Sequence, residues 1–148
     1  MKKLLKITAL AALLGACTSS NKVLLDEANK HYNNLEYHTA ALQFKKYLET
    51  HKNNLAEIRL AECYLHMNHF REAELAYAQV LQYTEFNASN KLQYAHTLKH
   101  NGKYHEAVLW FVEYLLENPK DAAVANEVRS CDSLKNYTRR SYEYKISA

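Results

Sequence analysis

Histidine is the residue type with the clearest capacity for metal chemistry in this sequence, which has eight of them among 148 residues. His96 and His100 are four residues apart, so on a helix they share one face, and this spacing can chelate zinc. A zinc site needs a third and a fourth ligand, and Glu62 is the one obvious carboxylate that the fold would bring close. We therefore expect polar surface histidines, and predict neither a metal nor another cofactor.

Cys63 is the candidate nucleophile, but a catalytic cysteine needs an ordered histidine and an oxyanion hole. We expect Cys63 to face a hydrophobic core instead. Cys131 lies 68 residues further on, and we expect both to be buried free thiols. Gly15 and Gly102 are far apart, which excludes a glycine-rich phosphate loop. No arrangement of residues supports catalysis, and the sequence predicts that the chain is not an enzyme.

The first residues of the chain have the pattern of an export signal. Residues 1–6 are basic, and Ile7 to Ala16 is apolar apart from Thr8. This apolar run is shorter than the ~20 residues that a membrane-spanning helix needs, and it is typical of a secretory signal. The run ends in Leu14-Gly15-Ala16-Cys17, which resembles the lipobox of bacterial lipoproteins.

The lipobox resemblance implies a signal peptide over residues 1–16, lipidation of Cys17 and a short polar tether over residues 17–21. Thr18 follows the cysteine, where an Asp would favour inner-membrane retention, so the resemblance implies attachment to the outer membrane. The alternative is an ordinary cleaved signal followed by a chance cysteine.

Removal of this signal changes the charge balance of the chain. The whole sequence has 19 Lys and Arg against 16 Asp and Glu, but Lys2, Lys3 and Lys6 lie in the signal. Without those three lysines, 16 basic residues face 16 acidic ones. No basic surface remains to bind phosphates, so we predict no nucleic-acid partner.

The body of the chain repeats itself. The phrase of an aromatic residue, two polar residues and an alanine occurs three times, at intervals of 33 and 34 residues. An aromatic residue stands four positions after each of these alanines, and another alanine stands nine positions before each phrase. The phrases begin at Tyr37, Phe70 and Tyr104; the alanines are Ala40, Ala73 and Ala107, the later aromatic residues Phe44, Tyr77 and Phe111, and the earlier alanines Ala28, Ala61 and Ala95.

This pattern resembles the tetratricopeptide repeat, whose signature is W-x2-L-G-x2-Y, then A-x3-F, then P. The sequence departs from it in having no Trp at the first position, Ala in place of Gly, and a proline in the third copy alone, Pro119. The resemblance implies an all-α solenoid of three antiparallel helix pairs with a capping helix. Two Gly and one Pro in the whole chain also favour an all-helical fold.

Hydrophobic periodicity predicts helices near residues 22–33, 37–51, 54–67, 70–83, 89–100 and 104–117. Asn33-Asn34, Asn68 and Asn101-Gly102 mark the turns within the pairs, because Asn and Gly tolerate left-handed backbone. Asp121 is expected to cap a seventh helix that ends near Asn136. The predicted units are repeats over residues 22–54, 55–87 and 88–119, a capping helix over 120–136 and a tail over 137–148.

Three further runs give a closer resemblance: Ala61-Glu62-Cys63-Tyr64, the run from Tyr94 to Tyr104, and Arg129 to Ser133. Together with the lipobox they resemble the N-terminal repeat domains of Bacteroidetes outer-membrane lipoproteins of the OmpA family. Some of these proteins are linked to type IX secretion. The family's peptidoglycan-binding domain would follow Ala148, so we expect no peptidoglycan binding from this chain alone, which is either a stand-alone paralogue or part of a split gene product.

In this fold the first helix of each pair lines a concave groove, which we predict to be the binding surface. The groove residues follow the small alanine of each first helix or precede it by one turn. They are Leu25, Asn29, Tyr32 and Asn33; Ile58, Glu62, Leu65 and His66; and Leu92, His96, Lys99 and His100. Some tetratricopeptide domains clamp a C-terminal carboxylate here. Asn29 fits that pattern and Arg59 adds charge, but Leu25 replaces a basic residue, and we expect no clamp.

The sequence therefore predicts a lipid-anchored, periplasm-facing scaffold at the outer membrane that binds a protein or peptide partner. Its expected role is an accessory to protein export or envelope assembly, such as type IX secretion. The alternative is a cell-wall tether, or the truncated repeat domain of a larger peptidoglycan-binding lipoprotein.

Overall fold

The structure is a computed structural model that describes residues 22–146, with side chains described for residues 22–134. The predicted signal peptide, Cys17 and most of the predicted tether lie outside the described residues, and so do the side chains of the predicted tail. Within the described part the regular structure is entirely helical.

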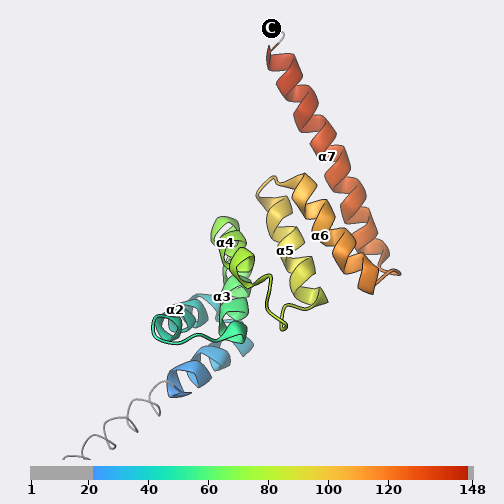
Figure 1. Cartoon of the computed structure of the whole chain (residues 1–148). Helices are drawn as coiled ribbons and strands as arrows, with labels where there is room; N and C mark the ends of the chain where they lie inside the picture. Colours follow the sequence, from blue (N-terminus) through green and yellow to red (C-terminus); the bar gives the residue numbers. More distant parts are fainter. Residues whose placement is uncertain (1–21, 147–148) are drawn as a thin grey trace, which may run out of the picture.

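The helices follow one another as antiparallel neighbours (Figure 1), each packed on the next along the chain. After a first helix over residues 22–33 come α2 (Tyr37–Leu48), α3 (Asn54–His66), α4 (Phe70–Val80), α5 (Ala88–His100), α6 (Tyr104–Glu117) and α7 (Ala122–Ile146). The predicted helix starts agree with these to within one residue. The predicted ends of α2 and α4 were three residues too late, because turns over residues 49–50 and 81–82 follow these helices.

The core consists of the residues that recur at the repeat interval. All six alanines of the pattern are fully buried, and so are Phe44, Tyr77 and Phe111. The alanines have no side chain beyond Cβ, so paired helices approach closely and the aromatic rings fill the space between pairs. Replacing a ring such as Tyr77 by alanine in a core of this kind costs ~3–5 kcal/mol.

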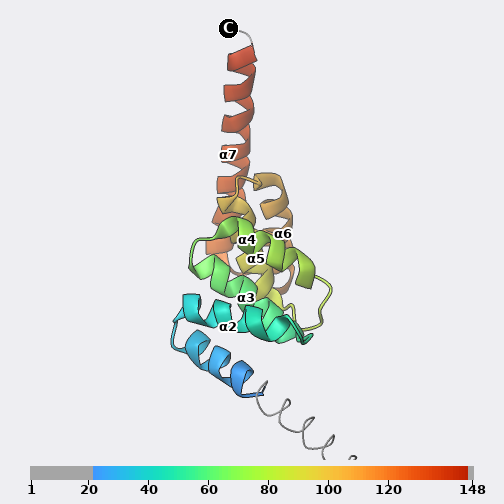
Figure 2. The ribbon, with the colours of Figure 1, turned by 90° about the vertical axis from the view of Figure 1, so that its left-hand side faces the viewer.

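α7 is longer than the sequence predicted. It begins at the expected place, where the Asp121 carboxylate accepts a hydrogen bond from the backbone N–H of Val124 at 3.1 Å. It does not end near Asn136 but continues to Ile146. The segment predicted as a tail contains neither Gly nor Pro, so no residue in it terminates a helix. The second half of α7 extends beyond the ends of α5 and α6 (Figures 1 and 2).

The turn inside each helix pair has one residue with left-handed backbone. These residues are Leu35 (φ 63°), Asn68 (φ 59°) and Gly102 (φ 75°), again at intervals of 33 and 34. Asn68 and Gly102 were predicted correctly, but in the first pair the conformation falls on Leu35 rather than on Asn33 or Asn34. The same hydrogen bond closes all three turns, from Glu36 N to His31 O, His69 N to Tyr64 O, and Lys103 N to Leu98 O, each 2.9 Å. The repeat geometry therefore fixes the position whatever residue occupies it.

Leu35→Asn should stabilise the chain. Left-handed backbone costs an ordinary L-residue ~1–2 kcal/mol and costs Asn less. The Leu35 side chain is 68% exposed, so its loss removes little packing. We expect urea unfolding to show a gain of about 0.5–1 kcal/mol.

Asn68→Leu is the matched control, because it places leucine on the equivalent backbone and should lower stability by a similar amount. Equal stability of Leu35→Asn and the parent chain would contradict the idea that the turn is strained.

Candidate functional site

The first helices of the three pairs are joined by a polar network across the predicted groove. The Arg59 guanidinium donates a hydrogen bond to the Asn29 side chain and lies 5.2 Å from the centroid of the Tyr32 ring. The Tyr32 hydroxyl donates to one oxygen of the Glu62 carboxylate at 2.6 Å. The Asn90 amide donates to the other oxygen at 2.9 Å. The network thus runs from the first helix through α3 to α5.

Glu62 is the centre of this network and is 9% exposed. Burial, together with the hydrogen bond to Glu62, raises the pKa of the Tyr32 hydroxyl, so Tyr32 stays a donor under all physiological conditions. A buried carboxylate is tolerated only when donors satisfy its oxygens, and here Tyr32 and Asn90 each satisfy one. The three repeats are therefore held in register by groups that the sequence predicted to face a ligand.

The apolar members of the predicted groove contribute to the core more than to a surface. Ile58 is only 2% exposed and belongs to a buried cluster that includes Tyr77 of α4 and Tyr94 of α5. It is therefore unavailable to a ligand, in contrast to the prediction, because α3 has α2, α4 and α5 packed around it. Leu65 and Leu92 pack on the same cluster and Leu25 on the neighbouring one, and all three are half-buried.

Sequence reasoning missed Leu55, which is 47% exposed on α3. It lies three residues before Ile58 and seven before Glu62, so it shares their face of the helix. The signal was present in this spacing, but Leu55 lies one turn outside the stretch that was considered. Asn90 was also missed, because nothing in its local sequence indicates a partner 28 residues earlier.

His66 and His100 occupy equivalent places and make equivalent contacts. The His66 ring stacks on Tyr37, the first residue of α2, with centroids 4.2 Å apart and planes 9° from parallel. The His100 ring stacks on Phe70, the first residue of α4, at 4.1 Å and 4°. Both histidines are exposed. Each therefore covers an aromatic ring of the preceding pair.

The remaining predicted groove residues lie towards the C-terminal end of the solenoid, except the exposed Asn33. Lys99 forms an ion pair with Glu127 of α7 and so ties the capping helix to α5. His96 is half-buried, with its ring edge-on to Phe111 at 5.1 Å. Burial lowers the pKa of His96, as do the nearby Lys99 and His100, against an opposing effect of Glu127.

Metal and thiol chemistry find no support in the described side chains. His96 faces Phe111 whereas His100 stacks on Phe70. Over residues 22–134 no three His, Cys, Asp or Glu side chains are grouped as metal ligands. Cys63 and Cys131 are buried free thiols, as predicted. Burial, and to a smaller extent the neighbouring Glu62, raises the pKa of Cys63 to about 12, which keeps it protonated and unreactive.

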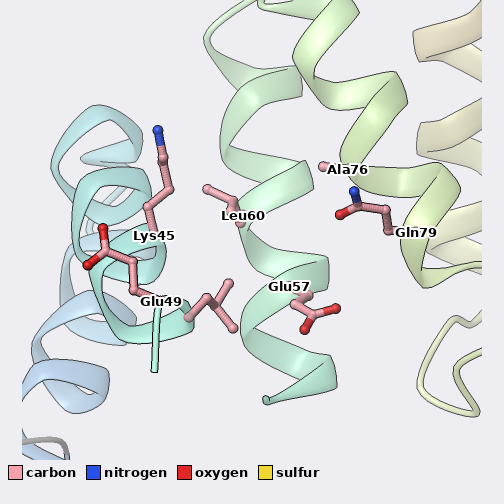
Figure 3. Close-up of a pocket in the computed structure, with 7 residues that line it drawn as sticks. Lys45, Glu49, Glu57, Leu60, Ala76 and Gln79 are labelled. Atoms are coloured by element: carbon pink, nitrogen blue, oxygen red, sulfur yellow. The ribbon is translucent and has the colours of Figure 1, made fainter. Parts of the chain in front are cut away.

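A cavity of about 370 Å³ lies on the other side of α3 (Figure 3). Leu60 and Glu57 of α3 line it, about half a helical turn away from Ile58 and Glu62. The other lining residues come from α2 and α4. They are Lys45, Leu48 and Glu49 of α2 and Ala76 and Gln79 of α4. No sequence pattern predicted this cavity, because it forms between helices whose packing had to be known first.

No family model and no curated protein matches this chain, but solved structures do. The second TPR domain of human RPAP3, solved with an HSP70 peptide, superposes with a TM-score of 0.62 at 19% identity over 76% of this chain and 98% of that one. A C-terminal TPR-containing domain of a putative FK506-binding protein from Plasmodium falciparum gives 0.67 at 18% identity, covering 82% and 92%. The fold is a tetratricopeptide-repeat solenoid.

Yeast Tom70 is also similar, with a TM-score of 0.71 at 16% identity. The tetratricopeptide solenoid described here spans 86% of this chain but only 26% of Tom70. At these identities the comparisons establish the fold, and they confirm the fold class that the 33- and 34-residue intervals predicted.

His96 should make stability depend on pH. Its pKa is lowered from 6.5 in the folded chain, so below about pH 6.5 the unfolded chain takes up a proton that the folded chain disfavours. Stability is therefore retained above this pH and falls as the pH is lowered. His96→Gln should reduce the loss of urea stability between about pH 7 and about pH 5.5.

The control is His38→Gln, which removes an exposed histidine of α2. An unchanged pH dependence in His96→Gln would show that the half-buried ring does not contribute.

Proposed function

We propose that this chain is a non-catalytic scaffold that binds a protein partner, through an extended or helical segment, on its concave face. The observation that carries the proposal is the network of Asn29, Tyr32, Arg59, Glu62 and Asn90, which spans all three repeats. Such a surface is rigid before the partner arrives, so binding loses little conformational entropy. Two proteins of the same fold were solved with peptides of HSP70 and HSP90, which supports this use of the fold.

Arg59 and Leu55 are the contacts that we assign to the partner. Glu62 is enclosed by its own donors, whereas Arg59 is half-buried and carries a planar set of N–H donors over the Tyr32 ring. Leu55 lies one turn away on the same face and offers an exposed apolar side chain. A segment with an apolar side chain next to a carbonyl or carboxylate fits this pair. The exposed His66 and His100 border it.

We further propose that a lipid on Cys17 holds the scaffold at the periplasmic side of a bacterial outer membrane. This rests on the Leu14-Gly15-Ala16-Cys17 run. Two acyl chains give stable attachment where one gives marginal attachment. Among the described residues no helix has the length and hydrophobicity needed to cross a bilayer. An accessory role in protein export, including type IX secretion, follows from the resemblance to OmpA-family lipoproteins.

Metabolic labelling tests the anchor. In a host with a lipoprotein pathway, the full chain should incorporate an alkyne fatty acid that is detected after gel electrophoresis. Cys17→Ser should abolish the label, whereas Cys63→Ala should retain it, since Cys63 is fully buried. Label that survives Cys17→Ser would exclude a lipid on Cys17.

In-cell photo-crosslinking tests the binding face. A benzoylphenylalanine probe at Leu55 should yield an adduct with a second protein, and the yield should fall about tenfold with Arg59→Ala, which corresponds to ~1.4 kcal/mol. A probe at Leu75 is the matched control, because this leucine is similarly exposed but belongs to α4.

The same protein captured equally from Leu55 and Leu75, or no protein captured from Leu55, would contradict binding on the concave face. Sedimentation of the purified chain with peptidoglycan, in the absence of other proteins, would instead favour the cell-wall tether.

A further inference from the structure

The second surface of interest is an apolar stripe on α6 that contacts nothing in the described chain. Leu109, Val112 and Leu116 are 55%, 42% and 72% exposed. Their spacing of three and four residues places them on one side of the helix. Glu113 lies beside them, exposed and without an ion-pair partner among the described side chains. An exposed row of large apolar residues next to an unpaired charge is typical of an interaction surface.

The cavity between α2 and α4 is the complementary surface at the other end of the solenoid. Figure 3 shows Leu60 of α3 between Lys45 and Glu49 on one side and Ala76 and Gln79 on the other. Its floor is apolar and its rim is charged. Its volume of about 370 Å³ lies within the ~300–1,000 Å³ of typical ligand pockets, so it has room for more than one aliphatic side chain.

Charge distinguishes the occupant of this cavity. Along α2 the exposed charges are Lys45, Lys46 and Glu49, in the order positive, positive, negative. Along α6 and the turn after it they are Glu113, Glu117 and Lys120, in the opposite order. Laid side by side in the same direction, the two segments place each charge near one of opposite sign. Lys45 and Lys46, like Glu113, have no ion-pair partner among the described residues.

We propose that the cavity between α2 and α4 receives the α6 stripe of a second copy of this chain, with Leu116 inserted over Leu60. The two surfaces differ and lie in different repeats, so the contact is head-to-tail and extends into a row of copies rather than closing as a symmetric dimer. A lipid surface fits the stripe poorly, because Glu113 and Glu117 beside it would be repelled by anionic headgroups. This association uses the face of α3 opposite the concave network and is independent of it.

Photo-crosslinking of the full chain in cells tests this association. A benzoylphenylalanine probe at Leu116 should give a ladder of bands at two, three and more times the mass of the chain. A probe at Leu35, which is similarly exposed at 68%, should give none. Lys45→Glu with Lys46→Glu should reduce the ladder from position 116 about tenfold, since like charges then face each other.

Charge exchange keeps this test independent of folding. Adding Glu113→Lys and Glu117→Lys to the α2 double variant restores opposite signs and should restore the ladder. Far-UV circular dichroism confirms that each variant remains helical. The proposal is overturned if the probe at Leu116 captures only a different protein, captures nothing, gives a band at twice the mass and no further, or gives a ladder that the α2 variant leaves unchanged.

Discussion

The whole solenoid depends on the close approach of helices at six fully buried alanines. At each of these positions a larger side chain would push two helices apart, and the aromatic ring four residues further along would lose its contacts. Because each pair packs only on its neighbours, the interval of 33 and 34 residues transmits this constraint along the chain. The positions of the turns, the stacked histidines and the concave network all follow from it.

The concave network shows how a repeat protein joins units that share no hydrophobic interior. The core consists of two clusters, one around Phe44 and one around Tyr77 and Phe111. Glu62 belongs to α3, between the two, and takes one hydrogen bond from Tyr32 in the first helix and one from Asn90 in α5. Loss of the carboxylate would leave two donors without a partner. The network therefore fixes the curvature of the surface to which we assign the partner.

The sequence predicts the helices and the buried positions well because both depend on local periodicity. It predicts the site less well because side-chain contacts between repeats depend on how the helices pack. Ile58 has the same local pattern as Leu25 and Leu92, yet helices surround it on three sides and bury it. Leu35 shows the reverse case, where repeat geometry overrides a residue's own preference for backbone conformation. The length of α7 was misjudged because polar composition was taken as a sign of a tail, although no helix-breaking residue is present.

The serial arrangement of the helices also determines how the chain responds to a pulling force. The first described helix and the end of α7 lie at opposite ends of the molecule (Figure 1), so tension applied between them loads every repeat in turn. α7 is held to α5 by the Lys99–Glu127 pair at one edge, which makes the capping helix the first element to peel away. Each repeat of about 33 residues that opens would then add up to ~110 Å of extended chain. A row of such domains would lengthen stepwise under load, like an extensible cord.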